Sequence, residues 1–386
     1  METTRRTFVA GTAAAGIALA AAGTALAEEA ATGTADAAED EGGGYSVIET
    51  DSGLQVTIAD DENPDLPTVV VLATGGTIAG TGEAGKTTGY AAGQLDVGTL
   101  VASAAGITDI ANVRGVQVCN VGSDDITDAY WIQIANTINE LATDDAISGF
   151  AVTHGTDTLE ETAYFLNLAV KTDKPVVITG AMRPSTATSA DGPMNLYQTI
   201  ALAANPDAAG RGAMVVFSDG IYGGRDVQKV NTFKTDAFSM RDMGCLGYMQ
   251  DNNAYFYNAT TKLHTVDTEF SVDGLDALPA VGVAYFTIDA DPGVLDYYAE
   301  NAQGIVIAGA GAGSYSGLWG EKIEELVGKG IPVVDCSRIN NGLVSGEDGG
   351  MIEGYNLPPQ KAVVLLRLAL TITTDLDKIQ EMFKTY

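Results

Sequence analysis

The residues that could do chemistry begin with Thr77, which follows an apolar run and two glycines. The run Thr68–Ala73 predicts a buried strand, and Thr74-Gly-Gly-Thr77 ends it abruptly. The glycines allow a tight turn and leave room for a ligand beside the backbone. The Thr77 hydroxyl would then be presented at the carboxyl end of a strand, where open α/β sheets bind their ligands. Thr77 could act as a nucleophile, or it could simply cap the helix that follows.

A second stretch repeats this arrangement and adds a carboxylate. An apolar strand runs into Thr153-His-Gly-Thr156-Asp157 just before a predicted helix. A hydroxyl at this position can attack or polarise a carbonyl group, and the adjacent carboxylate can hold an ammonium group or a base. The simpler alternative is a capping box formed by Thr158 or Asp157 with Glu161, which would explain one residue but not the consecutive Thr156-Asp157 pair.

A lysine could supply the base that the chain otherwise lacks. Only two histidines are present, so a zinc site rich in histidine or a histidine-based triad is hard to assemble. Lys229, in Asp226-Val-Gln-Lys229, follows a predicted strand and could serve in this role near a threonine hydroxyl and a carboxylate. Ser123 and Asp124 follow another predicted strand, although alone they indicate no more than a turn.

One match to a phosphate-binding motif has the wrong context. Gly80-Thr-Gly-Glu-Ala-Gly-Lys-Thr87 fits the pattern G-x-x-x-x-G-K-[ST]. In a phosphate-binding loop the strand leads directly into the glycines and a helix follows at once. Here six residues intervene after the strand, and Thr88–Gly93 is a poor start for a helix. We interpret the segment instead as a lid that follows Thr77 and carries Tyr90.

The elements that must position these residues alternate between strands and helices. This alternation predicts an α/β fold with a mainly parallel sheet covered on both faces. The predicted strands are Thr68–Ala73, Val113–Asn120, Gly149–Thr153, Pro175–Thr179, Ala213–Ser218, Val281–Thr287, Gly304–Ala308 and Ile331–Asp335. The predicted helices are Leu95–Ala105, Asp128–Ala142, Leu159–Val170, Asn195–Ala204, Val294–Ala302, Trp319–Lys329 and a helical pair within Pro359–Lys384. The polar section from Thr232 to Leu278 breaks the pattern and predicts a junction between a larger first domain and a smaller second one.

The N-terminus has the features of an export signal. Arg5 and Arg6 precede the Ala-rich run Phe8–Ala27, which ends in an A-x-A pattern. We expect export by the twin-arginine route, with an ordinary secretory signal as the alternative. Cleavage would then remove this segment and leave a periplasmic or extracellular mature protein. The expected organisation is signal peptide 1–27, acidic linker and possible short hairpin 28–64, first domain 65–262, interdomain linker 263–278 and second domain 279–386.

The overall charge restricts the partners. The formal net charge of −31 would repel phosphate polyanions, so nucleic acid and anionic membrane surfaces are excluded as expected partners. The chain has three cysteines, which allow at most one disulfide. Stability must therefore come mainly from the hydrophobic core, which 46% hydrophobic composition over 386 residues can supply.

Taken in order, the motifs resemble those of the bacterial type II L-asparaginases, over about Thr68 to Tyr386. The matching motifs are Thr74-Gly-Gly-Thr-Ile-Ala-Gly80, Thr153-His-Gly-Thr-Asp-Thr158, Gly180-Ala-Met-Arg-Pro184 with Ser189-Ala-Asp-Gly-Pro193, and Asp226-Val-Gln-Lys229. The resemblance implies hydrolysis of L-asparagine to aspartate and ammonia through a covalent acyl-enzyme, with no cofactor and no metal.

The resemblance also implies catalytic roles. Thr77 would be the primary nucleophile, assisted by Tyr90 on the flexible loop. Thr156, Asp157 and Lys229 would form a second group that activates a hydroxyl or water.

Further residues would bind the substrate. Ser123 and Asp157 match residues that hold its α-carboxylate and α-ammonium groups, and Gly76, Thr156 and Ala181 would also contact it. Asp124 stands where relatives carry Gln or Glu. Backbone N–H groups near Gly76, Thr77 and Thr156 could stabilise the oxyanion.

Two residues would cross a subunit boundary. Ser314 matches an Asn or Ser, and Glu347 a Glu, that a neighbouring subunit lends to each site in a homotetramer of close dimers. The rival hypothesis is a secreted protein that binds an amino acid without turnover, because two α/β lobes with a polar cleft also describe that class. A binding protein has no need of Thr77, Thr156 and Lys229 together.

Overall fold

The computed structural model describes residues 45–50, 52–59, 62–87, 91–95, 97–345 and 350–386. The predicted signal peptide, most of the acidic linker, Tyr90 and Glu347 therefore lie outside the described residues. Within the described ranges, no helix is both long enough and apolar enough to cross a membrane.

The first domain is built on a ten-stranded sheet in the described residues, with the order β1-β2-β4-β3-β5-β6-β7-β8-β11-β12. Its centre is parallel from β4 to β7. These strands are β3 (Thr68–Gly75), β4 (Asn112–Val121), β5 (Ile147–Thr153), β6 (Val176–Thr179) and β7 (Ala213–Phe217). Every residue of β3 is buried, as expected for a strand in the middle of a parallel sheet.

Helices cover both faces of this sheet, because alternate residues of β3 enter two different apolar clusters. Val70 and Leu72 pack with residues of α2 and α3, whereas Val69 and Val71 pack with residues of α1 and α4. The helices are α1 (Val97–Ala102), α2 (Asp128–Leu141), α3 (Leu159–Ala169) and α4 (Gly192–Ala203). The arrangement confirms the predicted α/β fold with helices on both faces. The first sheet is mixed rather than mainly parallel, because antiparallel strands flank its parallel centre on both sides.

Both edges of the sheet are antiparallel. At one edge β1 (Tyr45–Glu49) and β2 (Gln55–Ala59) form a hairpin in the range for which the sequence predicts one. The other edge is formed by β8 (Gly220–Gly223), β11 (Gly247–Gln250) and β12 (Asn253–Phe256).

The β11–β12 hairpin corrects the prediction that Thr232–Leu278 is irregular. Each strand has four residues and alternates between more buried and more exposed positions, too short a pattern to stand out from a polar sequence. Asp251 takes a positive φ of 54° in the turn, which the sequence alone does not announce. The same section contains β10 (Phe238–Ser239), paired with β9 (Gln228–Lys229).

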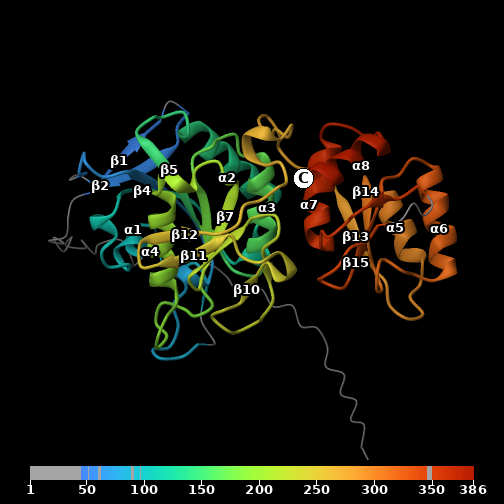
Figure 1. The fold of residues 1–386 in the computed structure, drawn as a ribbon, viewed down its shortest axis with the longest axis horizontal. Helices are drawn as coiled ribbons and strands as arrows, with labels where there is room; N and C mark the ends of the chain where they lie inside the picture. Colours follow the sequence, from blue (N-terminus) through green and yellow to red (C-terminus); the bar gives the residue numbers. More distant parts are fainter. Residues whose placement is uncertain (1–44, 51, 60–61, 88–90, 96, 346–349) are drawn as a thin grey trace, which may run out of the picture. The chain divides into compact units, whose positions relative to one another are not determined.

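The second domain has a parallel four-stranded sheet in the described residues, in the order β13-β14-β15-β16. The strands are β13 (Val281–Tyr285), β14 (Gly304–Gly309), β15 (Val333–Ser337) and β16 (Ile352–Glu353). The helices are α5 (Gly293–Asn301), α6 (Gly317–Gly328), α7 (Pro359–Leu370) and α8 (Leu376–Thr385). Helix α7 also packs against α3 of the first domain (Figure 1).

All three cysteines are free thiols in the structure. Cys336 is buried in β15, and burial raises the pKa of its thiol well above the ordinary range. Cys119 is half-buried, and the same effect raises its pKa to about 11. Neither thiol is therefore activated as a nucleophile at neutral pH.

Candidate active site

Thr77 lies in a tight turn at the carboxyl end of β3. Gly75 and Gly76 both have positive φ, 103° and 77°, which residues with a side chain rarely adopt. Thr77 is buried and begins the short 3₁₀ helix η1 (Thr77–Ala79). Gly76 occupies the cap position of η1, so Thr77 does not cap this turn. The alternative that Thr77 caps the following helix is therefore wrong for this turn.

The turn at Gly76 packs directly against the turn that follows β5. Strands β3 and β5 are parallel neighbours, with Ala73 opposite Thr153. A Cβ added to Gly76 would lie 2.4 Å from the Cα and N atoms of Gly155, so only glycine fits. The stretches that carry Thr77 and Thr156 are therefore in backbone contact at the same edge of the sheet.

Lys229 joins Thr156 and Asp157 in one cluster. Its ammonium Nζ donates to the Thr156 hydroxyl at 2.9 Å and to Asp157 Oδ1 at 2.5 Å. Thr156 is 6% exposed and the Lys229 side chain 15%, whereas the Asp157 side chain is 72% exposed. The cluster thus has a buried hydroxyl held by a cation, and a carboxylate that faces solvent and could meet a charged ligand.

Ser123 is part of the same cluster. Its hydroxyl accepts a hydrogen bond from the Asp157 backbone N–H at 3.2 Å, and its carbonyl accepts one from the Thr158 hydroxyl at 2.7 Å. A Cβ on Gly155 would lie 2.8 Å from the Ser123 hydroxyl, so glycine is again required. Asp124, the next residue, is exposed.

The predicted capping box at the start of α3 is wrong. Thr158 occupies the cap position, but its side chain makes no capping hydrogen bond. Its hydroxyl instead donates to the Ser123 carbonyl, which connects the turn after β5 to the turn after β4.

The prediction that the Gly76 N–H could stabilise an oxyanion must also be corrected. This group already donates a hydrogen bond to the Val121 carbonyl.

His154 has a structural role. It is fully buried, with Nδ1 at 2.7 Å from the Gly155 carbonyl and Nε2 at 2.9 Å from the Thr162 hydroxyl. Thr162 also accepts a hydrogen bond from the indole N–H of Trp131. Burial lowers the pKa of His154 to about 4, so it is neutral at physiological pH.

The remaining predicted residues lie in several places. Ala181 is buried and follows β6, at the same edge of the sheet as Thr77 and Thr156. Ser314 is exposed and follows β14 in the second sheet, where its backbone forms a bridge with Ala310. Tyr90 and Glu347 are outside the described residues, so the lid hypothesis for Tyr90 stays a prediction.

Sequence reasoning did not assign three polar residues beside Lys229 to the site. They are Glu160, Glu161 and Gln360. The Glu160 carboxylate accepts hydrogen bonds from the Lys229 backbone N–H and, at 2.6 Å, from Gln360 Nε2. With Asp157, Glu161 and Lys229, these two residues line a pocket of about 610 Å³. Burial, with Glu160 as a smaller contribution, raises the pKa of Glu161 to about 7. The only sequence signal was the acidic first turn of α3, which ordinarily indicates favourable interaction with the helix dipole.

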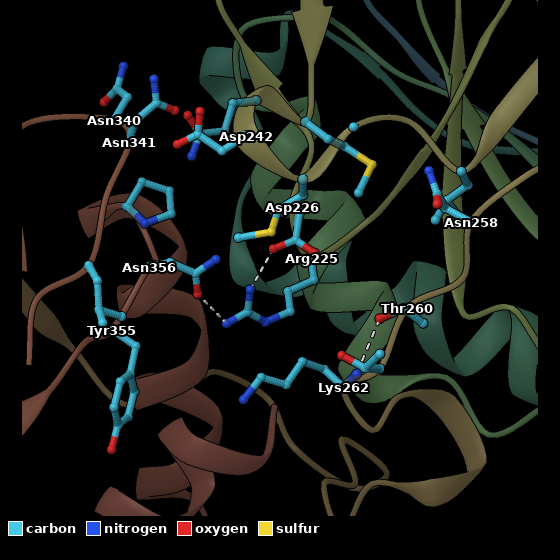
Figure 2. Close-up of a pocket in the computed structure, with 18 of the residues that line it drawn as sticks. Arg225, Asp226, Asp242, Asn258, Thr260, Lys262, Asn340, Asn341, Tyr355 and Asn356 are labelled. Atoms are coloured by element: carbon cyan, nitrogen blue, oxygen red, sulfur yellow. Dashed lines mark hydrogen bonds and ion pairs between the residues drawn. The ribbon is translucent and has the colours of Figure 1, made fainter.

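A second pocket of about 650 Å³ contains none of the predicted site residues (Figure 2). Its wall includes Arg225, whose guanidinium donates to Asp226 at 2.5 Å and to Asn356 at 2.8 Å. The same side chain donates to the Tyr386 carbonyl at 3.0 Å. The Arg225 charge is therefore already engaged within the chain and leaves little for a ligand.

The segment Gly80–Thr87 does not have the surroundings of a phosphate-binding loop. The N–H groups of Gly82 and Gly85 donate to Thr186. No helix begins in the described residues between Gly80 and Leu95. The interpretation as a loop after Thr77, rather than as a nucleotide site, is therefore the better one.

Comparisons with known proteins identify the class to which this fold and site belong. The family model "Asparaginase, N-terminal" matches residues 68–262, and "Glutaminase/Asparaginase C-terminal domain" matches 280–383. The chain belongs to the asparaginase/glutaminase family.

Individual relatives cover most of the chain. It is 46% identical to "L-asparaginase 2" from Bacillus subtilis over 84% of this chain and 88% of the relative. It is 41% identical to "Probable L-asparaginase periplasmic" from Haemophilus influenzae, over 86% and 97%. The crystal structure of "Probable Cytoplasmic L-asparaginase" from Campylobacter jejuni aligns with a TM-score of 0.80 and 44% identity, over 83% of this chain and all of that one.

Proposed function

We propose that this protein hydrolyses L-asparagine to L-aspartate and ammonia through a threonine acyl-enzyme. The observation that carries the proposal is the contact of one ammonium group, on Lys229, with both Thr156 and Asp157 in a turn packed against that of Thr77. A hydroxyl nucleophile needs a group that removes its proton, and Lys229 can do so as the neutral amine, after its ammonium group has passed a proton to the Asp157 carboxylate that it contacts.

In the first half-reaction the Thr77 oxygen attacks the side-chain amide carbon of asparagine. The Thr77 proton passes through the neighbouring groups to the amide nitrogen, and the carbon–nitrogen bond breaks to release ammonia. In the second half-reaction water attacks the resulting ester, its proton returns to the Thr77 oxygen, and aspartate leaves. Thr156, Asp157 and Lys229 activate the hydroxyl or the water, and Tyr90 assists Thr77.

Substrate orientation comes from polar groups around these residues. Ser123 and Asp157 hold the α-carboxylate and α-ammonium ends, while Gly76, Asp124 and Ala181 line the site. Positioning of this kind can contribute several kcal/mol to lowering a barrier, about 7–11 kcal/mol in the best intramolecular cases. The carboxylate of Asp157 is suited to an ammonium group because its side chain is 72% exposed and can be reached from solvent.

The test is ammonia release from L-asparagine by the wild-type protein and by Thr77→Val and Lys229→Met. We expect turnover by the wild type and a loss of at least about 100-fold in kcat for each variant. Rapid acid quenching followed by mass spectrometry should detect an aspartyl ester on Thr77. Binding of asparagine without any release of ammonia would refute the proposal and favour the amino-acid-binding alternative.

Three finer features belong to the same proposal. Glutamine would be a secondary substrate, since one extra methylene changes discrimination by only about 1–3 kcal/mol. The protein would form a homotetramer of close dimers in which Ser314 and Glu347 reach a neighbouring site. It would be exported through its paired arginines. The tests are kcat/KM for both amides, sedimentation analysis, and cell fractionation of an Arg5→Lys, Arg6→Lys variant.

A further inference from the structure

The first turn of α7 contains a buried lysine that catalysis, as described above, does not use. Lys361 is 0% exposed, and its Nζ donates to the carbonyls of Gly224, Arg225 and Val227 at 2.9, 2.7 and 2.5 Å. An ammonium group has three donors, so all of its hydrogen-bonding capacity is directed at one short segment. That segment leads directly into Lys229.

Lys361 is an unfavourable choice for its position on ordinary grounds. Burial of an ammonium group is costly, and a cation in the first turn of a helix opposes the helix dipole. Burial lowers the pKa of Lys361 to about 8, with Glu160 as the largest opposing influence. A methionine of similar length would pack there without these costs. The three carbonyl contacts are therefore the feature that distinguishes lysine from an apolar residue.

The residue before Lys361 holds the other side of Lys229. Gln360 Nε2 donates to one oxygen of Glu160, and the second oxygen of Glu160 accepts the Lys229 backbone N–H. Arg225, within the same segment, donates a hydrogen bond to Asn356 of the second domain (Figure 2) and another to the Tyr386 carbonyl. The chain is thus fixed both before Lys229 and at Lys229 itself.

We infer that Lys361 and Gln360 are positioning residues for amide hydrolysis: they hold the backbone at Lys229 so that its ammonium group reaches Thr156 and Asp157 together. This inference rests on the proposed function. Neither residue touches the substrate in this scheme, and both come from the second domain. The second domain thus sets the geometry of a catalytic group in the first.

The decisive comparison is between Lys361→Met and Lys171→Met. Lys171 is a matched control, because its Nζ also donates to backbone carbonyls, those of Thr265 and Thr268, at 3.1 and 2.8 Å. Its contacts lie away from Lys229. Lys171 is exposed whereas Lys361 is fully buried, but both substitutions remove an ammonium group together with its carbonyl contacts, so both should lower the melting temperature.

We expect only Lys361→Met to lower turnover. Displacement of a catalytic group by about 1 Å can cost about 100-fold in rate, so the turnover rate at saturating asparagine should fall by about 10-fold or more. The KM for asparagine should stay nearly constant, and the pH–rate profile should change shape. In a Lys229→Ala background the Lys361→Met substitution should cause no further fall, because the group it positions is absent.

A second variant, Gln360→Met, tests the inference if Lys361→Met does not fold. Gln360→Met removes only the hydrogen bond to Glu160 at a half-buried position, and it should lower kcat with a similar change in the pH profile. Wild-type turnover and an unchanged profile in whichever variant folds would overturn the inference. Inactivity of the wild-type protein would instead overturn the proposed function, so the two failures are distinguishable.

Discussion

The close contact between the turns after β3 and β5 makes Gly76→Ala a severe test of the site. Gly76 has φ 77° and ψ −171°, a region essentially restricted to glycine, and forcing another residue into it costs about 1–3 kcal/mol. The new Cβ would lie 2.4 Å from two backbone atoms of Gly155, whereas ordinary contacts begin at 3.4 Å. One of the turns must move by about 1 Å, and overpacking of this kind costs about 1–3 kcal/mol more.

The expected loss in the free energy of unfolding is therefore about 2–6 kcal/mol, the sum of the two contributions. Activity should fall by about 100-fold even under conditions where the variant is folded, because the displaced turns carry Thr77 and Thr156. Urea unfolding followed by circular dichroism measures the first quantity. Ammonia release at saturating asparagine measures the second.

Gly106→Ala is the matched control. Gly106 also has a positive φ, 80° with ψ 4°, but the nearest atom to its added Cβ, in Tyr197, is 3.7 Å away. This variant should lose about 1–2 kcal/mol from backbone strain alone and keep its turnover. Equal stability and equal turnover of the two variants would refute the argument that the Gly76–Gly155 contact sets the geometry of the site.

Three further predictions concern titration and redox state. The pKa of Glu161 is raised in the folded state, to about 7 against 4.5, so between these pH values the folded state binds more protons than the unfolded state. The stability that the protonated side chain contributes is therefore lost as pH rises from 4.5 through 7. Glu161→Gln should thus gain stability relative to wild type between pH 4.5 and 7, by about 3 kcal/mol in urea titrations; a pH-independent difference would contradict this. The lowered pKa of His154, about 4 against 6.5, has the opposite sign, and its contribution is lost as pH falls from 6.5 to 4. A His154 signal titrating near 6.5 in NMR spectra would contradict burial of the ring. Reducing agent should leave the melting temperature unchanged, since Cys119, Cys245 and Cys336 are free; a shift would indicate a disulfide.

The sequence predicted the central elements well because they are long and strongly patterned. The apolar run that forms β3 and the glycine pair after it are local signals, and parallel strands bring their carboxyl ends to one edge. The proximity of Thr77, Thr156 and Ser123 followed from that rule. Contact of Lys229 with Thr156 could be expected only through family resemblance, since 73 residues separate them.

The contacts that the sequence did not indicate are long-range and chemically ambiguous. Lys361 lies 134 or more residues from the carbonyls that it binds, and a lysine in a helix ordinarily predicts an exposed side chain. Glu160 lies in the first turn of α3, where an acidic residue ordinarily indicates only a favourable interaction with the helix dipole. These residues gain their partners only in the folded chain, where α7 lies against α3 and against the segment that leads to Lys229.

That packing also has a consequence for folding. One continuous apolar cluster joins Val70 and Leu72 of β3, through Phe165 of α3, to Leu365 of α7 and Val306 of β14. The two family domains therefore share this cluster, although each also has an apolar cluster of its own, and we expect them to unfold in a single cooperative transition rather than one by one. Isolation of residues 68–262 would expose the apolar face of α3 to water and favour aggregation.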